Sequence, residues 1–377
     1  MIPVYKPWIT DLEKSYVNEA LNEGWISSGR FIEKSEELLA NYLNVKYALV
    51  ASSGTTALHL CLRVLDNKLQ SIHDDIDNSN GVILIPNTTF VASSAVALYD
   101  KRAIELVDIN YETWNIDLDL VDEICSTTRV FAVMPVHLYG NPCDMDGLLE
   151  LQNKYEFNII EDACESLGAS INGIKTGTIG DVGCFSFYGN KLLSCGEGGA
   201  VVTNNENLYK RAKLLRGQAQ DPNKRYWHID VGYNYRMTNI QAAILTAQLE
   251  RINEITHEKQ RVNNRYIKNL DGIKMQKVLK GHINSNWLIS IELPGSYLPV
   301  EEDLRNSGIE TRKIFYPISS MPSYNDHYSN FPNSERLSSR GLSLPSYPQL
   351  TDSEIDFVCN KVKESISKNF KNGYGYD

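Results

Sequence analysis

Short apolar runs alternate with longer amphipathic stretches through the first two thirds of the chain. The β-rich runs are Ala48–Ala51, Val82–Ile85, Ile104–Val107, Val130–Val136 and Asn158–Ile160. The segments between them are long enough for crossover helices, so the alternation predicts an α/β fold with a mostly parallel sheet. A further pair of runs, Gly183–Phe187 and Ala200–Thr203, flanks a glycine-containing turn around Lys191.

The pattern changes near Ile240 to long helix-forming stretches. These are Gln241–Leu249 and Ile255–Tyr266, followed by short strands near Asn286–Glu292 and a final helix near Glu354–Ser367. We therefore expect a large domain over residues 1–250 and a smaller α/β domain over 251–377. The polar runs Ser71–Gly81 and Ser323–Ser339 are predicted to be surface loops.

The composition favours an ordinary globular protein that does not bind nucleic acid or membranes. The chain has 377 residues, of which 42% are hydrophobic and 22% charged, and its formal net charge is −10. An acidic surface repels nucleic acid and anionic lipid. The longest uncharged apolar stretch, Val130–Leu138, is shorter than the roughly 20 residues that span a bilayer, and residues 1–7 have no signal-peptide core. We therefore expect a cytoplasmic protein.

The seven cysteines stand at 61, 125, 143, 164, 184, 195 and 359. Their number is odd and no Cys-x-x-Cys pair occurs, so the sequence indicates neither a disulfide framework nor a zinc site. No metal is expected, and reduced thiols fit a cytosolic compartment.

The segment Ala51–Leu60 is a candidate anion site. It follows a predicted strand and opens a helix, so free backbone N–H groups and small hydroxyls would meet at the positive end of a helix dipole. A simple Ser/Thr helix cap has the same appearance. The interpretation therefore depends on what accompanies this segment elsewhere in the chain.

Two further segments carry residues that would complete a binding site with this one. The run Ile159–Glu165 delivers Asp162 to the carboxyl end of a strand, where open α/β sheets bind ligands and where an aspartate can hold a protonated pyridine nitrogen. The run Ser186–Lys191 places a hydroxyl and a lysine before Gly196-Glu197-Gly198-Gly199. A lysine amine that is neutral and well positioned forms a Schiff base with an aldehyde. A helix cap for Asp162 and a surface position for Lys191 are the alternatives when each is taken alone.

The ordered set resembles the sugar aminotransferases of the DegT/DnrJ/EryC1/StrS family, within the fold-type I pyridoxal-phosphate enzymes. The resemblance covers nearly the whole chain. The segments that carry it are Trp25–Gly29, Ser53–Leu58, Pro86–Phe90, His137–Gly140, Glu161-Asp162, Lys191, Glu197–Gly199, Gly232–Thr238 and Glu310–Arg312. The runs Phe187–Lys191 and Tyr226–Ile240 look most like the branch of GDP-perosamine synthases and related sugar 4-aminotransferases.

The resemblance implies roles for individual residues around pyridoxal 5′-phosphate. Lys191 would form the Schiff base, Asp162 would pair with the pyridine nitrogen, and Phe90 would stack on the ring. Gly54, Thr55 and Ser186 would hold the phosphate, and Asn234 would reach the phosphate of the partner subunit in a homodimer; a turn-stabilising role for Asn234 is the alternative. Glu165 falls where the family often places glutamine or histidine beside the phenolic oxygen, a position that is electrostatically unfavourable for a carboxylate.

The implied reaction is a two-step transamination. L-glutamate would leave 2-oxoglutarate and pyridoxamine 5′-phosphate, which would then aminate C4 of a nucleotide-linked 4-keto-6-deoxyhexose to a perosamine or viosamine type of product. The residues expected at the sugar nucleotide are Trp25, Ser27, His137, Tyr226, Trp227, Arg236, Arg312 and Tyr316.

Two other classes stay open. A pyridoxal-phosphate sugar dehydratase of this family generally has histidine in place of the Schiff-base lysine, and a non-catalytic sugar-binding or cofactor-binding regulator would share the fold. The presence of Lys191 argues against the dehydratase. The non-catalytic regulator is disfavoured because the chain keeps the full set of Asp162, Ser186 and Lys191.

Overall fold

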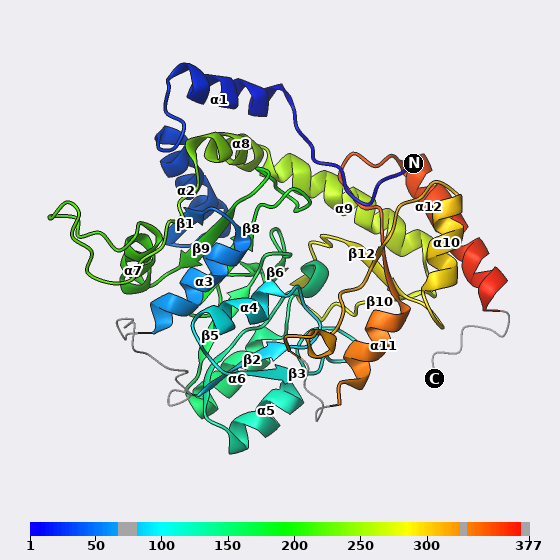
Figure 1. Ribbon diagram of the computed structural model, residues 1–377. Coiled ribbons are helices and arrows are strands. Elements are labelled where there is room, and N and C mark those ends of the chain that lie inside the picture. Colours follow the sequence, from blue (N-terminus) through cyan, green and yellow to red (C-terminus); the bar gives the residue numbers. More distant parts are fainter. Residues whose placement is uncertain (67–80, 325–329, 371–377) are drawn as a thin grey trace.

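The computed structural model describes residues 1–66, 81–324 and 330–370 (Figure 1). A seven-stranded sheet in the order β1-β9-β8-β5-β4-β2-β3 forms the centre of the larger part. The strands are β1 (Tyr47–Ala51), β2 (Val82–Pro86), β3 (Ile104–Val107), β4 (Val130–Val133), β5 (Asn158–Asp162), β8 (Val182–Ser186) and β9 (Gly199–Thr203). Only β9 runs antiparallel to its neighbours in this sheet. The predicted α/β fold with a mostly parallel sheet is confirmed.

Helices cover both faces of this sheet, because alternate residues of each strand are apolar and buried on opposite sides. Leu49 of β1 belongs to a core with α3 (Gly54–Leu65), α4 (Ala92–Tyr99) and α7 (Glu206–Arg216). Val50 faces the other side, where α1 (Asp11–Asn22), α2 (Arg30–Leu43) and α8 (Asn239–Glu250) pack. Further along that second face lie α5 (Leu118–Thr127) and α6 (Met145–Tyr155). The result is a three-layer arrangement (Figure 1).

The strand register brings the ligand-binding ends of several strands together. Asp162 at the end of β5 pairs with Cys184 of β8, and Ser186 at the end of β8 pairs with Gly199 at the start of β9. A Cβ atom on Gly199 would lie 2.3 Å from the carbonyl oxygen of Ser53, so glycine is required for the close approach of the β1–α3 junction. The candidate residues of three separate sequence segments thereby meet at one edge of the seven-stranded sheet.

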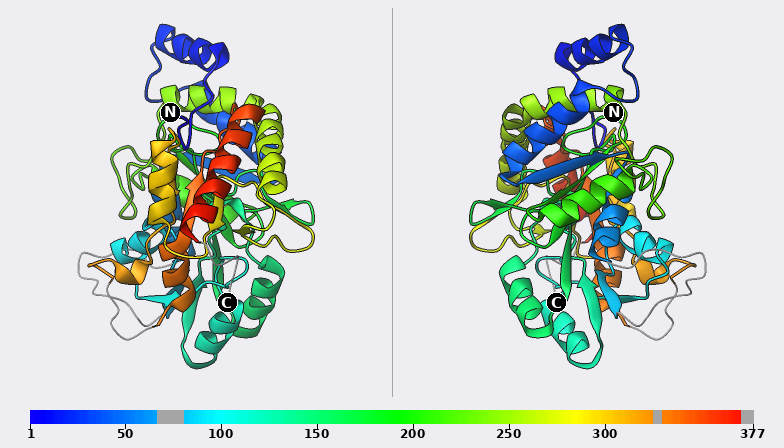
Figure 2. Two further views of the ribbon diagram at one scale, coloured as in Figure 1. Left: turned by 90° about the vertical axis from the view of Figure 1, so that its right-hand side faces the viewer. Right: turned by 90° about the vertical axis from the view of Figure 1, so that its left-hand side faces the viewer.

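The smaller part has its own sheet and core. The antiparallel strands β10 (Lys274–Met275), β12 (Ile289–Glu292), β14 (Gly341–Leu344) and β13 (Arg312–Lys313) pack against α9 (Ile252–Asn269), α10 (Leu298–Asn306) and α12 (Asp352–Asn369). The predicted division near residue 250 falls between α8 and α9. The first residues of the chain nevertheless join the smaller part, because Ile2 bridges to Ile309 and packs on its core. Figure 2 shows the N-terminus close to α10 and α12.

Smaller elements complete the described chain. A three-stranded sheet is formed by β11 (His282–Ile283), β6 (Ser170–Ile171) and β7 (Ile174–Lys175), and the short 3-10 helices are η1 (Leu138–Gly140) and η2 (Ile318–Ser320). No helix in residues 1–66, 81–324 and 330–370 is both long enough and apolar enough to cross a bilayer.

The structure corrects the bounds of one predicted strand and part of one predicted loop. The strand expected over Val130–Val136 ends at Val133, two residues before Pro135, which lacks the N–H that a ladder requires. The loop expected over Ser323–Ser339 is wrong where it meets α11 (Pro332–Arg340). That helix begins at a proline, and the N–H of Ser334 donates to the carboxylate of Asp108 at 2.9 Å, a partner from a distant segment. The loop expected at Ser71–Gly81 lies outside the described residues, apart from Gly81.

Candidate functional site

A cavity of about 470 Å³ opens where β1, β5 and β8 end. Of the residues predicted for cofactor or substrate, it brings together Gly54, Thr55, Phe90, Asp162, Glu165, Ser186, Lys191 and Arg312. Side chains of the smaller part, including Trp287 and Phe315, close its other side. The site therefore lies between the two parts of the chain.

The first turn of α3 forms one wall of the cavity. Ser53 caps this helix: its Oγ accepts from the N–H of Thr56 at 3.1 Å, and Thr56 Oγ1 accepts from the N–H of Ser53 at 3.0 Å. Among the described residues, no group accepts a hydrogen bond from the N–H of Gly54 or Thr55. A Cβ on Gly54 would lie 2.7 Å from the Cβ of Ser186, so glycine lets these N–H groups and the Ser186 hydroxyl face one anion.

Asp162 is a buried carboxylate at the end of β5, with 5% of its surface exposed. Its Oδ2 accepts from Ser93 Oγ at 2.8 Å, and its Oδ1 accepts from the N–H of Cys164 at 3.2 Å. No lysine, arginine or histidine of the described residues forms an ion pair with it. Because a buried carboxylate is unfavourable without a compensating charge, this position suits a cationic ligand.

Lys191 lies in the turn between β8 and β9. Its Nζ is 3.4 Å from Glu165 Oε1 and 3.5 Å from the ring centroid of Trp287. The backbone on both sides is fixed, because the Tyr5 hydroxyl donates to the Lys191 carbonyl and Trp287 Nε1 donates to the Asn190 carbonyl at 2.6 Å. The amine is thus held at the cavity wall between an acid and an aromatic ring.

Glu165 is buried next to that amine. Its Oε2 accepts from the N–H of Tyr139 at 2.8 Å, and Tyr139 has the left-handed φ of 54°. Burial raises the pKa of the Glu165 carboxyl, although the charge of Lys191 and the Tyr139 N–H act in the opposite direction. The carboxyl of Glu165 is therefore the acidic neighbour of the Lys191 amine in the cavity.

Glu161 and His137 form a separate buried pair outside the cavity. Glu161 accepts hydrogen bonds from the N–H groups of Gly177, Ile179 and Gly180 at 2.5–2.7 Å. His137 Nδ1 accepts from the N–H of Cys143 at 3.0 Å, so its Nε2 carries the proton and donates to Glu161 at 3.0 Å. His137 thus braces a loop and is not among the residues that line the cavity. Its contact with substrate stays a prediction.

The remaining predicted residues lie at the surface of this chain. Asn234 Oδ1 accepts from Arg236 Nε and Nη2 at 3.3 and 3.2 Å, and both side chains are exposed. The other predicted substrate residues outside the cavity are Trp25, Ser27, Tyr226, Trp227 and Tyr316, all of them exposed. Their contacts with a substrate or a second chain stay predictions.

Three residues of the site were not predicted from the sequence. Tyr5 and Trp287 contact the Lys191 turn from sequence separations of 186 and 97 residues, and no local pattern marks either one. Ser93, by contrast, lies one turn into the segment that follows the Pro86–Phe90 motif. A hydroxyl there is a recognisable partner for Asp162.

The fold and this site define an α/β enzyme built around a lysine amine. A family model described as "DegT/DnrJ/EryC1/StrS aminotransferase family" matches residues 7–363. The chain belongs to this aminotransferase family, and the predicted resemblance is confirmed.

Individual proteins agree with that assignment. The chain is 40% identical over 373 residues to "GDP-perosamine synthase" of Escherichia coli O157:H7, a match that covers 97% of this chain and 99% of the relative. A protein of the same name from Vibrio cholerae is 39% identical over 375 residues, covering 96% and 98%. The crystal structure of a DegT DnrJ EryC1 StrS aminotransferase from Brucella abortus superposes with a TM-score of 0.86 at 26% identity, covering 94% of this chain and 95% of that one.

Proposed function

We propose that the chain is a pyridoxal-5′-phosphate-dependent aminotransferase that moves an amino group from L-glutamate to C4 of a nucleotide-linked 4-keto-6-deoxyhexose. One observation carries this proposal: the amine of Lys191, the carboxylate of Asp162 and the first N–H groups of α3 face a single cavity, and within the described residues that carboxylate has no ion-pair partner. The relatives named GDP-perosamine synthase support a GDP-linked sugar and a product of the perosamine type. A UDP-linked sugar, giving a viosamine type of product, is the second candidate.

The residues present fit the cofactor. A phosphate dianion matches the N–H groups of Gly54 and Thr55 and the Ser186 hydroxyl, in a cradle that a Cβ on Gly54 would fill. A protonated pyridine nitrogen would supply the positive charge that Asp162 lacks among the described residues. Phe90, which is 55% exposed at the cavity, offers a flat apolar surface for the ring.

When bound, pyridoxal 5′-phosphate supplies an aldehyde that condenses with amines and a ring that accepts electrons from the reacting carbon. Lys191 Nζ would be the amine that holds the cofactor at rest. Lys191 Nζ, once free, would take the proton from the α-carbon of glutamate and pass it to the cofactor, and in the second half-reaction it would carry a proton from the cofactor to C4 of the sugar. The Trp287 ring, 3.5 Å away, limits the range of this amine.

The cationic side chains at the outer wall would bind the anionic parts of both substrates. Arg312 is exposed at the cavity, and its planar guanidinium suits a diphosphate or a carboxylate. Lys313 lies next to it, with its Nζ 2.9 Å from the ring centroid of Tyr316. The diphosphate of a sugar nucleotide and the carboxylates of glutamate, which bind at different stages of the reaction, would share this region.

Borohydride reduction tests the role of Lys191 directly. We expect the purified protein to be yellow after incubation with pyridoxal 5′-phosphate, and reduction to attach the cofactor to the peptide that contains Lys191. Lys313→Ala, which removes another cationic side chain of the same cavity, is the matched control and should still be labelled at Lys191. A label on any other lysine would contradict the proposal.

Turnover separates the candidate substrates. Purified protein is supplied with L-glutamate and, in parallel, with GDP-, UDP- or dTDP-linked 4-keto-6-deoxyhexose, and 2-oxoglutarate is measured. We expect the GDP-linked sugar to give the highest kcat/KM and Lys191→Ala to give no multiple turnover. Preference for the UDP-linked sugar would select the second candidate. No 2-oxoglutarate with any of the three would refute amino transfer from glutamate to these sugars.

A further inference from the structure

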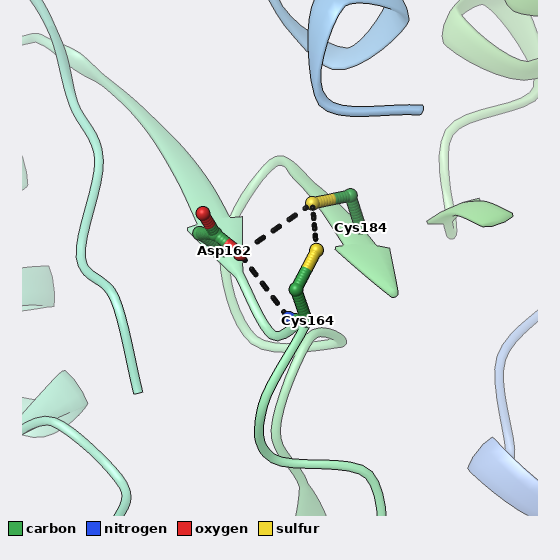
Figure 3. Close-up of side chains that lie close together, drawn as sticks. All are labelled: Asp162, Cys164 and Cys184. Carbon is green, nitrogen blue, oxygen red and sulfur yellow. Dashed lines mark hydrogen bonds between the residues drawn. The ribbon is translucent and has the colours of Figure 1, made fainter. Parts of the chain in front are cut away.

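Two thiols lie beside the Asp162 carboxylate, and the proposed transamination uses neither. Cys164 follows β5 and Cys184 lies in β8, so the sheet register brings them together although 20 residues separate them. Figure 3 shows the two sulfur atoms turned toward each other, with Asp162 beside them. Cys164 Sγ is 3.5 Å from Cys184 Sγ, and Cys184 Sγ is 3.9 Å from Asp162 Oδ1.

These separations match the edges of a metal coordination tetrahedron. With Zn–S bonds of about 2.3 Å and Zn–O bonds of about 2.1 Å, a tetrahedral zinc ion has S···S edges of about 3.8 Å and S···O edges of about 3.6 Å. One ligand atom from each of Asp162, Cys164 and Cys184 lies within 4.8 Å of the other two. Movements of up to about 1 Å would therefore place all three around one cation.

The chemistry of the cluster selects a soft cation. Thiolate ligands favour Zn²⁺ over Mg²⁺ or Ca²⁺, and binding would release the two thiol protons. The Asp162 carboxylate is oriented by Ser93 Oγ and by the N–H of Cys164, as a metal-bound carboxylate usually is. The charge of the cation would also compensate this buried acid.

A cation has a path to the cluster through the cavity. Cys164 is half-buried and lines the cavity together with Gly54 and Ser186, whereas Cys184 is fully buried behind it. The fourth coordination position, left to water, would then face the cavity, where pyridoxal 5′-phosphate is proposed to bind.

We propose that Asp162, Cys164 and Cys184 bind Zn²⁺ when the cofactor is absent, and that the bound cation and the cofactor exclude each other because both need the Asp162 carboxylate. The metal site follows from the geometry of three side chains. The exclusion rests in addition on the proposed function. The sequence did not indicate this site, because positions 162, 164 and 184 form no metal-binding motif.

Cobalt(II) is the probe for the metal site, since Co²⁺–thiolate bonds absorb in the near ultraviolet. Full-length protein is freed of cofactor with hydroxylamine, dialysed, and titrated with Co²⁺. We expect one equivalent to produce a thiolate charge-transfer band that one equivalent of Zn²⁺ removes. Cys164→Ser and Cys184→Ser should each weaken Co²⁺ binding at least about tenfold, because one of three protein ligands becomes a poor one.

Cys359→Ser is the matched control, because Cys359 is a buried thiol in the core of the smaller part and should leave the titration unchanged. Cys164, at the cavity wall, keeps the test valid if Cys184→Ser fails to fold. A missing charge-transfer band, or a band that persists in Cys164→Ser, would overturn the metal site.

Competition is measured separately from metal binding. Saturating Zn²⁺ should prevent the yellow colour that pyridoxal 5′-phosphate gives with wild-type protein, and Cys164→Ser should become yellow in the presence of Zn²⁺. If Co²⁺ binds as expected but the cofactor binds equally well with Zn²⁺ present, the exclusion is wrong. If the metal-free protein never becomes yellow or labels at Lys191, the proposed function fails instead.

Discussion

Lys259 lies on the buried face of α9, and its surface is 3% exposed. Its Nζ donates to the carbonyl oxygen of Ser346, and no carboxylate of the described residues pairs with it. Burial lowers the pKa of this amine from 10.5 to about 7. Replacing it with methionine, which has a similar length and no charge, should therefore stabilise the fold.

The direction and size of this effect depend on pH. Because Lys259 loses its proton more easily in the folded chain, the unfolded chain binds more protons between pH 7 and 10.5, and the stability of the wild type rises with pH in that window. The shift corresponds to a destabilisation of about 4 kcal/mol at pH 7 and about 2 kcal/mol at pH 9. The lost hydrogen bond to Ser346 offsets about 1 kcal/mol, so Lys259→Met should gain about 3 kcal/mol at pH 7 and about 1 kcal/mol at pH 9.

Guanidinium unfolding followed by tryptophan fluorescence, at one protein concentration and at both pH values, measures this difference. Lys268→Met is the matched control, because Lys268 is an exposed lysine of the same helix and its replacement should give the same small change at pH 7 and pH 9. A Lys259→Met gain that is equal at the two pH values, or a loss at pH 7, would refute the reasoning.

The other predictions concern the site. Gly54→Ala should weaken binding of pyridoxal 5′-phosphate at least about tenfold in an absorbance titration, because its Cβ would lie 2.7 Å from that of Ser186. Glu165→Gln removes an acid 3.4 Å from Lys191 Nζ, so the lysine-bound cofactor should lose its proton at lower pH. A spectrophotometric pH titration measures this midpoint. An unchanged midpoint would show that Glu165 carries no charge beside the lysine-bound cofactor. If Asn234 serves the partner's phosphate, dimers mixed from Lys191→Ala and Asn234→Ala chains should recover up to about half of one dimer's activity at limiting cofactor, whereas no recovery would place Asn234 in its own chain.

Local patterns were enough to predict the strands and the residues that follow them. Gly54, Asp162 and Lys191 each come directly after, or in the turn after, an apolar run, and parallel strands end at the same edge of a sheet. This is why the sequence places them together. The turn of Lys191 additionally depends on Tyr5, near the start of the chain, and on Trp287 of the smaller part, and no periodicity encodes such contacts.

His137 shows that a place in a sequence motif does not by itself define the role of a residue. It stands in a motif that the resemblance associates with the site, but its two ring nitrogens are both used by the N–H of Cys143 and the carboxylate of Glu161. A motif residue can thus brace the loop beside a site through its own hydrogen bonds. Only the hydrogen-bond partners of each nitrogen distinguish the two roles.

The three acids of the segment Glu161–Glu165 differ in their partners in the folded chain. Glu161 accepts hydrogen bonds from three backbone N–H groups and from His137, so its charge is compensated within the fold. Glu165 has the Tyr139 N–H and the amine of Lys191. Asp162 has a hydroxyl and a backbone N–H as its close partners and no cation among the described residues. Since a buried acid lowers stability unless a positive charge compensates it, Asp162 is, of these three acids, the one whose surroundings best suit a cationic ligand.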